Sequence, residues 1–273
     1  MTSAPAQVFI DGAFRPADHA EPVLEAATGE HLGDGASAGP ADVDAAVAAA
    51  RAALPGWRAT PAAERAGVLR AMATALKARA KYTNELVTRE NGMPMSLSRG
   101  ANGAFPALLL NYYADLITTM ADEEIRPSAI GHTIVRREPV GVVAAITPWN
   151  YPQALAAFKL APALAAGCPV VLKPSPETAL DALVFGEAAD EVGREVHAGR
   201  SQQGERRDGA DPVHAGNGAG AGHDDGQAGG DDGGGPARLC REISQAVQEP
   251  DGDAVGCLHD HPVAEGCRQS RGV

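Results

Sequence analysis

The fold class is decided by the stretch Val140-Gly141-Val142-Val143-Ala144-Ala145-Ile146-Thr147-Pro148-Trp149-Asn150-Tyr151-Pro152. Its first seven residues are a continuous apolar run, which is typical of a strand covered on both faces. A helix over about 153–166, a second buried strand over 169–173 and a helix from the cap Thr178 to Gly193 follow. This strand–helix–strand–helix order predicts the first half of a doubly wound α/β domain, whose two strands are parallel neighbours.

The chain before this stretch is predicted to be helical, with short strands. Asp11-Gly12 predicts the turn of a hairpin. Apolar spacing predicts several helices, and prolines, glycines and capping residues mark their ends. The boundaries predicted in this way are a start near Pro40, a stop at Pro55-Gly56, an N-cap at Thr60 before Pro61, a stop at Asn91-Gly92, and a helix from Phe105 to Met120.

The composition of the chain changes at Arg194. All 11 aromatic residues lie at or before Phe185, and the last lysine is Lys173. The final 80 residues hold 17 of the 32 glycines but only two leucines and one isoleucine. Such a segment buries too little apolar surface to offset the entropy of ordering it. The predicted organisation is therefore a helical region over 1–138, a partial α/β domain over 139–193 and an unstructured tail over 194–273.

Charge and cysteine content narrow the class of protein. The formal charge of −12 argues against nucleic acid or an acidic membrane surface as a partner. No apolar run approaches the ~18 residues that span a bilayer, and the N-terminus does not resemble a secretory signal. Cys168 is the one cysteine before residue 194, and we interpret it as a core residue. A cytoplasmic protein is the expectation.

The segment Thr147–Pro152 is the first candidate site. It follows a buried strand, and ligands of open α/β sheets bind at the carboxyl ends of the strands. Two prolines stiffen the turn, and the amide of Asn150 donates two hydrogen bonds without charge, which suits a developing oxyanion. The alternative is that Asn150 caps the following helix.

Lys173-Pro174-Ser175-Pro176 occupies the equivalent place after the second strand. A lysine in this position could bind ribose hydroxyls or a phosphate. The alternative is a surface lysine at the end of a strand. Two such segments after adjacent parallel strands support each other, because both are expected at the same edge of the sheet.

These segments resemble the N-terminal part of the aldehyde dehydrogenase superfamily over about residues 8–193. The most specific similarity lies in two motifs and their spacing, Pro148-Trp149-Asn150-Tyr151-Pro152 and Lys173-Pro174-Ser175. Further similar segments are Phe9-Ile10-Asp11-Gly12, Ala27-Thr28-Gly29-Glu30, Asp42–Val47, Trp57-Arg58, Glu64-Arg65, Glu90-Asn91-Gly92 and Pro139–Val142. The resemblance implies a Rossmann-like cofactor domain over 139–193, preceded by a region of the oligomerisation type.

The resemblance also implies a reaction, the NAD- or NADP-dependent oxidation of an aldehyde to a carboxylic acid through a cysteine thiolate. Asn150 matches the asparagine that stabilises the oxyanion. The cofactor-binding positions implied are Ile146, Thr147, Pro148, Trp149, Lys173, Ser175 and Pro176. Pro176 stands where many NAD-preferring members have a glutamate, so the choice between NAD and NADP stays open. No metal ion is implied.

The family's later motifs are missing from the sequence. No Glu-Leu-Gly-Gly segment carries the general base, and no Gly-Gln-x-Cys segment carries the nucleophile. We therefore expect the chain to be inactive alone, and without the family's bridging strand we do not expect the family's homo-oligomer. The alternative function is a non-catalytic nucleotide-binding or interaction module with a functional acidic tail.

Three interpretations of the tail stay open. Its composition, rich in Gly, Ala, Arg and Asp, is what GC-rich DNA encodes out of frame, which leads to the hypothesis that the reading frame shifts near Gly193. Gly216-x-Gly218-x-x-Ala221 formally matches a dinucleotide fingerprint but follows no predicted strand. Zinc-ligand residue types occur at Cys257, His259, His261 and Cys267, with a spacing that fits no standard site.

Overall fold

The computed structural model describes residues 6–208 and 244–245, with side chains described through residue 195. The chain begins with a hairpin of β1 (Gln7–Ile10) and β2 (Ala13–Pro16), paired antiparallel. Its turn is Asp11-Gly12, and both residues have positive φ, 53° and 71°. This is the conformation that a two-residue hairpin turn requires, so the predicted hairpin is confirmed.

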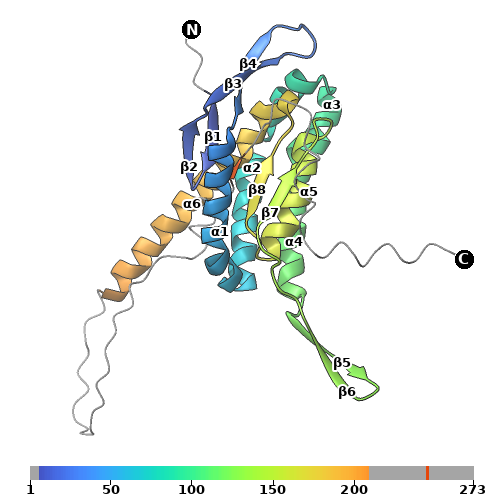
Figure 1. Ribbon diagram of the computed structural model, residues 1–273, viewed down its shortest axis with the longest axis vertical. Coiled ribbons are helices and arrows are strands. Elements are labelled where there is room, and N and C mark those ends of the chain that lie inside the picture. The colour runs from blue at the N-terminus through green and yellow to red at the C-terminus, as the bar shows by residue number, and fades with distance from the viewer. Residues whose placement is uncertain (1–5, 209–243, 246–273) are drawn as a thin grey trace, which may run out of the picture.

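Two more antiparallel hairpins extend from the body (Figure 1). One consists of β3 (His19–Leu24) and β4 (His31–Ser37). The other consists of β5 (Glu123–Ser128) and β6 (Gly131–Arg136), and it projects as a narrow arm from the end of α4.

Helices α1 (Pro40–Ala59), α2 (Ala62–Asn91) and α4 (Phe105–Thr119) make up most of the body, with the short α3 (Met95–Ser98) and the π-helix η1 (Arg99–Ala104) between the last two. The stop predicted at Pro55-Gly56 is wrong, because α1 continues through it to Ala59. The continuation places Trp57 in the core, 1 % exposed, where its Nε1 donates to the carbonyl oxygen of Leu164 at 3.0 Å. Thr60 ends α1 and does not cap α2, whose N-cap is Pro61.

The predicted strand–helix–strand–helix unit is present. β7 (Val143–Ile146) and β8 (Val170–Lys173) are parallel and adjacent, joined by α5 (Pro152–Ala165). The turn η2 (Pro176–Thr178) and α6 (Ala179–Asp208) follow, and β9 (Ser244–Gln245) adds a third parallel strand beside β8. The sheet therefore has the order β7-β8-β9.

Only one of the two strands is covered on both faces. The residues of β8 from Val170 to Leu172 are all buried, with alternate side chains in two core clusters. Val170 and Leu172 pack in the larger cluster with α2, α4, α5 and α6, whereas Val171 packs with β1 and α1. In β7, Ala145 is buried but Ala144 and Ile146 are exposed, so the expectation that this strand is covered on both faces is wrong for the described chain.

The last predicted helix is longer than expected. It continues past Gly193 to Asp208, so residues 194–208 of the predicted tail are helical. Apart from β9, the rest of that tail, with its fingerprint-like glycines and its zinc-ligand residue types, lies outside the described residues. None of the described helices combines the length and the apolar composition needed to span a membrane.

Two glycine substitutions test the backbone that carries the sheet. Gly167, between α5 and β8, has φ +88°, and an added Cβ would lie 2.9 Å from Cγ of Pro139. We expect Gly167→Ala to lower the free energy of unfolding by about 1–3 kcal/mol, because an L-residue is strained at positive φ and the contact adds to that strain. Urea unfolding followed by circular dichroism measures the change.

The matched control is Gly67→Ala in the interior of α2, where an added Cβ meets no atom within 4 Å. This change should raise the free energy of unfolding by about 0.5–1 kcal/mol, because alanine has the higher helix propensity. Equal effects of the two substitutions would contradict the assigned backbone conformation.

Candidate functional site

The two predicted site segments meet at the carboxyl edge of the sheet. Ile146 and Lys173 end neighbouring parallel strands and are register partners. The backbone N–H of Thr147 donates to the carbonyl oxygen of Lys173 at 3.0 Å, which extends the pairing by one residue into the loop. The structure therefore joins the starts of the two segments, Ile146 and Thr147 with Lys173, at the edge that the strand order predicts.

The first segment exposes its large side chains. Ile146 is 64 % exposed and Trp149 is 50 % exposed, and Pro148 and Asn150 are exposed as well, while Thr147 is buried. Asn150 does not cap α5, because the N-cap of that helix is Tyr151 and no side-chain hydrogen bond caps it. The capping alternative is therefore wrong.

The second segment supplies a cation and a turn. Lys173 is half-buried, and its Nζ lies 3.5 Å from the carbonyl oxygen of Pro174, with no carboxylate partner among residues 6–195. The hydroxyl of Ser175 donates to the carboxylate of Glu177, and exposed Pro176 begins the turn η2. Exposed apolar side chains beside an unneutralised ammonium group match the two halves of a dinucleotide, its flat rings and its polar ribose phosphates, so these residues fit such a ligand.

A buried polar junction lies behind both segments. Glu90, in the last turn of α2, is 4 % exposed, and its two carboxylate oxygens accept from the backbone N–H groups of Leu180 (2.8 Å) and Asp181 (3.1 Å) in the first turn of α6. Nε2 of Gln153, in the first turn of α5, donates to the carbonyl oxygen (2.6 Å) and to Oδ2 (2.8 Å) of Asp181. The predicted cap of this last helix, Thr178, is buried with no partner for its hydroxyl, so Glu90 takes the capping role.

The two carboxyl groups of this junction titrate abnormally. Burial raises the pKa of Asp181 to about 7, against the lowering effect of its hydrogen bonds with Gln153 and Glu90. Burial, and then the charge of Asp181, raises the pKa of Glu90 well above its ordinary value. Two neighbouring carboxylates in a buried site repel each other, so the fold favours a proton on the pair.

One contact of the first segment comes from a residue outside the predicted site. Asn91, the last residue of α2, donates from Nδ2 to the carbonyl oxygen of Trp149 at 3.0 Å. The sequence marks Asn91-Gly92 as the end of a helix, and Gly92 does end it with φ +76°. Nothing in the local pattern indicates a partner 58 residues away, so no sequence signal could have found this contact.

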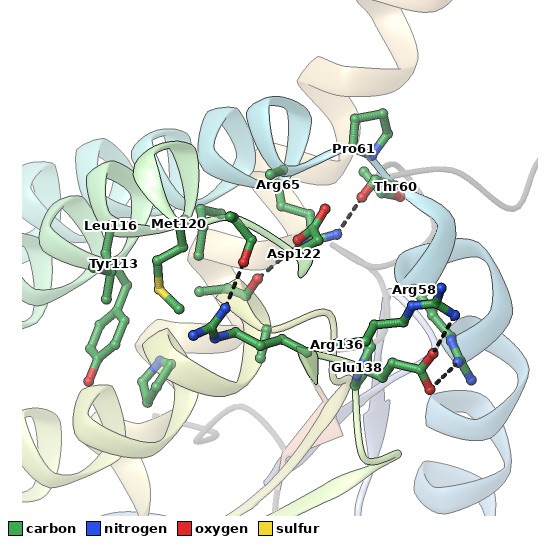
Figure 2. Close-up of a pocket in the computed structure, with 18 of the residues that line it drawn as sticks. Arg58, Thr60, Pro61, Arg65, Tyr113, Leu116, Met120, Asp122, Arg136 and Glu138 are labelled. Carbon is green, nitrogen blue, oxygen red and sulfur yellow. Dashed lines mark hydrogen bonds and ion pairs between the residues drawn. The ribbon is translucent and has the colours of Figure 1, made fainter. Parts of the chain in front are cut away.

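A cavity of about 540 Å³ lies elsewhere, at the base of the β5–β6 arm (Figure 2). None of the predicted site residues lines it. Its arginines are already engaged, since Arg58 pairs with Glu138 at 3.1 Å, Arg136 pairs with Glu123 at 2.6 Å, and Nε of Arg65 donates to the carbonyl oxygen of Ala165 at 3.0 Å. Burial lowers the pKa of the Arg65 guanidinium. The cavity therefore lies between the helices and the arm and is lined by charged groups that already have partners.

Cys168 is buried, as predicted, and is 3 % exposed. It precedes β8, so it lies at the amino end of that strand, whereas Asn150 follows the carboxyl end of β7. A four-residue strand separates the two edges by roughly 13 Å. Cys168 therefore does not belong to the candidate site, and no group of three or more His, Cys, Asp or Glu residues in the described chain could hold a metal ion.

Comparison with known proteins adds an independent line of evidence. A sequence model of the Aldehyde dehydrogenase family matches residues 14–208. Geranial dehydrogenase of Castellaniella defragrans is 47 % identical over 174 residues, which are 63 % of this chain and 36 % of that enzyme. The chain thus spans well under half the length of this curated relative. The match reaches residue 208, beyond the span of 8–193 expected from the motifs.

Solved structures resemble the described fold. An NADP-dependent enzyme of E. coli superimposes with a TM-score of 0.65 at 36 % identity, covering 69 % of this chain and 40 % of that one. An aldehyde dehydrogenase variant of Pseudomonas syringae, solved with NAD⁺ and octanal, gives a TM-score of 0.65 at 35 % identity, covering 68 % and 38 %. The mixed α/β fold with a Rossmann-like unit, expected from the sequence, is confirmed.

The junction of Glu90 and Asp181 makes stability depend on pH. Because their pKa values are raised in the fold, the folded chain holds more protons than the unfolded chain from about pH 4, the ordinary value for a carboxyl group, to about pH 7. The free energy of unfolding therefore falls as the pH rises through this interval. We expect Asp181→Asn to flatten that fall and to stabilise the chain at pH 8 by about 1–3 kcal/mol.

Thermal and urea unfolding between pH 5 and pH 8 measure this dependence. Asp190→Asn, a change of the same kind at a partly exposed site on α6, is the control and should keep the wild-type slope. A wild-type slope in Asp181→Asn would show that the pair does not titrate as assigned.

Proposed function

The chain belongs to the aldehyde dehydrogenase family, and on that premise we propose that it carries the N-terminal part of the machinery for NAD(P)-dependent oxidation of an aldehyde. The observation that carries the proposal is the pairing of Ile146 and Thr147 with Lys173 at the carboxyl edge of the β7–β8 pair, where the loop that carries Asn150 begins. The names of the relatives support the cofactor class, since one solved relative is described as NADP-dependent and another was solved with NAD⁺.

The described residues have distinct roles in this proposal. The amide of Asn150 donates hydrogen bonds to the aldehyde oxygen as that oxygen gains negative charge. Exposed Ile146 and Trp149 give the dinucleotide an apolar surface, and Lys173 holds its ribose or phosphate groups. When bound, NAD(P)⁺ supplies the acceptor for the electron pair that leaves the substrate. Thr147 keeps the two segments in register through its bond to Lys173.

We assign no residue of this chain as the nucleophile or as the general base. No motif for either is present in the sequence, and Cys168 is buried at the opposite edge of the sheet. We therefore propose that the chain does not turn over aldehydes by itself. The hypothesis of a frame shift near Gly193 stays a proposal, and the family match that reaches residue 208 weighs against a shift before that residue. The coding DNA tests it, because the missing motifs must then be encoded intact in another reading frame.

Nucleotide binding is the first test of the proposed function. We expect the purified chain to bind NAD⁺ or NADP⁺ saturably in isothermal titration calorimetry. Lys173→Ala should weaken that binding by about tenfold, because it removes the one cation of the site. Lys159→Ala, which removes an exposed lysine from α5, should leave the affinity unchanged. Equal affinities of the two variants would contradict the role of Lys173.

Turnover is the second test. With NAD⁺ or NADP⁺ and geranial, the substrate named for the relative from Castellaniella defragrans, we expect no reduced nucleotide to form above the uncatalysed rate. Measured absorbance at 340 nm reports the product. Any turnover above the uncatalysed rate would contradict the expected inactivity, and turnover that survives replacement of Cys168 and of the three later cysteines by alanine would contradict the cysteine thiolate mechanism. Saturable binding without turnover would also fit the non-catalytic module.

A further inference from the structure

The loop that carries Asn150 has few attachments to the rest of the fold. At its start, the N–H of Thr147 donates to Lys173, and at its end the carbonyl oxygen of Tyr151 accepts from the N–H of Leu155 inside α5. Between these two points, the described chain provides a single hydrogen bond from another element, the 3.0 Å bond from Nδ2 of Asn91 to the carbonyl oxygen of Trp149. The side chain of Asn150 itself is exposed.

The hydrogen bond from Asn91 holds the peptide unit that joins Trp149 to Asn150. The carbonyl group of Trp149 and the N–H group of Asn150 belong to the same planar peptide unit, in which they point in opposite directions. A bond that fixes the carbonyl therefore fixes the plane from which Cα and the side chain of Asn150 extend. The described chain has no cis peptide bond, so the carbonyl group of Trp149 and the N–H group of Asn150 lie on opposite sides of their peptide bond.

The donor itself is held rigidly. Oδ1 of Asn91 accepts from the backbone N–H of Met93 at 2.9 Å, so both ends of the amide are engaged and its orientation is determined. The residues before it are also tied. Arg89 bonds through its carbonyl oxygen to the N–H of Ala26 (2.8 Å) and through Nε to Glu25 (2.7 Å), and Glu90 caps α6. Because this donor is held in place at the end of α2, its hydrogen bond restricts the movement of the carbonyl group that accepts it.

We propose that Asn91 is a positioning residue for Asn150, acting through its hydrogen bond to the carbonyl oxygen of Trp149. The inference rests on the proposed function, because Asn150 needs a fixed direction only if it donates to a ligand. Preorganised donors stabilise a developing charge because no reorientation is needed when the charge forms. Both ends of the Asn91 amide are bonded within the chain, so its proposed effect passes through the loop.

Two substitutions separate this role from a structural role at the end of α2. Asn91→Asp keeps the acceptor for the N–H of Met93 and the size of the side chain, but it replaces the donor that faces Trp149 by an acceptor. Asn91→Ala removes both bonds and introduces no charge. A merely structural role in the turn would therefore respond to Asn91→Ala alone, and a simple charge effect would respond to Asn91→Asp alone.

The chain contains two tryptophans that serve as the probe and its internal control. Trp149 lies in the loop, and Trp57 is buried in the core. In chain labelled with 5-fluorotryptophan, ¹⁹F NMR gives one resonance for each, and Trp149→Phe assigns them. We expect both Asn91 variants to shift the Trp149 resonance towards its value in the unfolded chain and to leave the Trp57 resonance in place.

A shift of Trp149 in one variant only, no shift in either, or equal shifts of both tryptophans would overturn the proposal. The measurement uses the chain without nucleotide. Failure of nucleotide binding would therefore count against the proposed function and leave the test of Asn91 intact.

Discussion

The carboxyl group of Glu90 bonds to the first backbone N–H groups of α6, and the arrangement of the site depends on that contact. The first N–H groups of a helix have no partner within it, so a buried helix start requires an acceptor from elsewhere. Glu90 supplies it from the end of α2, and Gln153 joins α5 through Asp181. One junction thus fixes the helices that follow both site loops, because α5 follows Asn150 and α6 follows Lys173.

Short-range patterns predict the parts of this fold that depend on local physics. The Asp11-Gly12 turn, the parallel strands of the α/β unit and the pairing of Ile146 with Lys173 all follow from turn chemistry, apolar runs and strand order. Local patterns give wrong predictions where a contact with a residue far along the chain determines the structure. Pro55-Gly56 does not end α1, because the helix must deliver Trp57 to the core.

For the same reason, the sequence does not indicate the junction of Glu90 and Asp181. Glu90 reads as a charged residue near a helix end, and its partners lie about ninety residues away at Leu180 and Asp181. Thr178, which has the residue type of a cap, is buried without a partner for its hydroxyl. Likewise, β7 has the apolar sequence of a fully covered strand, yet one of its faces is exposed in the described chain. The apolar sequence of a strand shows that both of its faces can be buried. The packing of the rest of the chain decides which of those faces are buried.

The β5–β6 arm has a consequence for how the chain behaves in solution. Its two strands form a sheet of their own, so in the described chain each presents an unpaired edge to solvent, and such edges invite pairing with another molecule. Ion pairs such as Arg136 with Glu123 and Arg126 with Glu124 line the arm and oppose that pairing. Exposed ion pairs weaken as salt screens them. We therefore expect concentrated salt to weaken the opposition of these charged side chains to edge pairing.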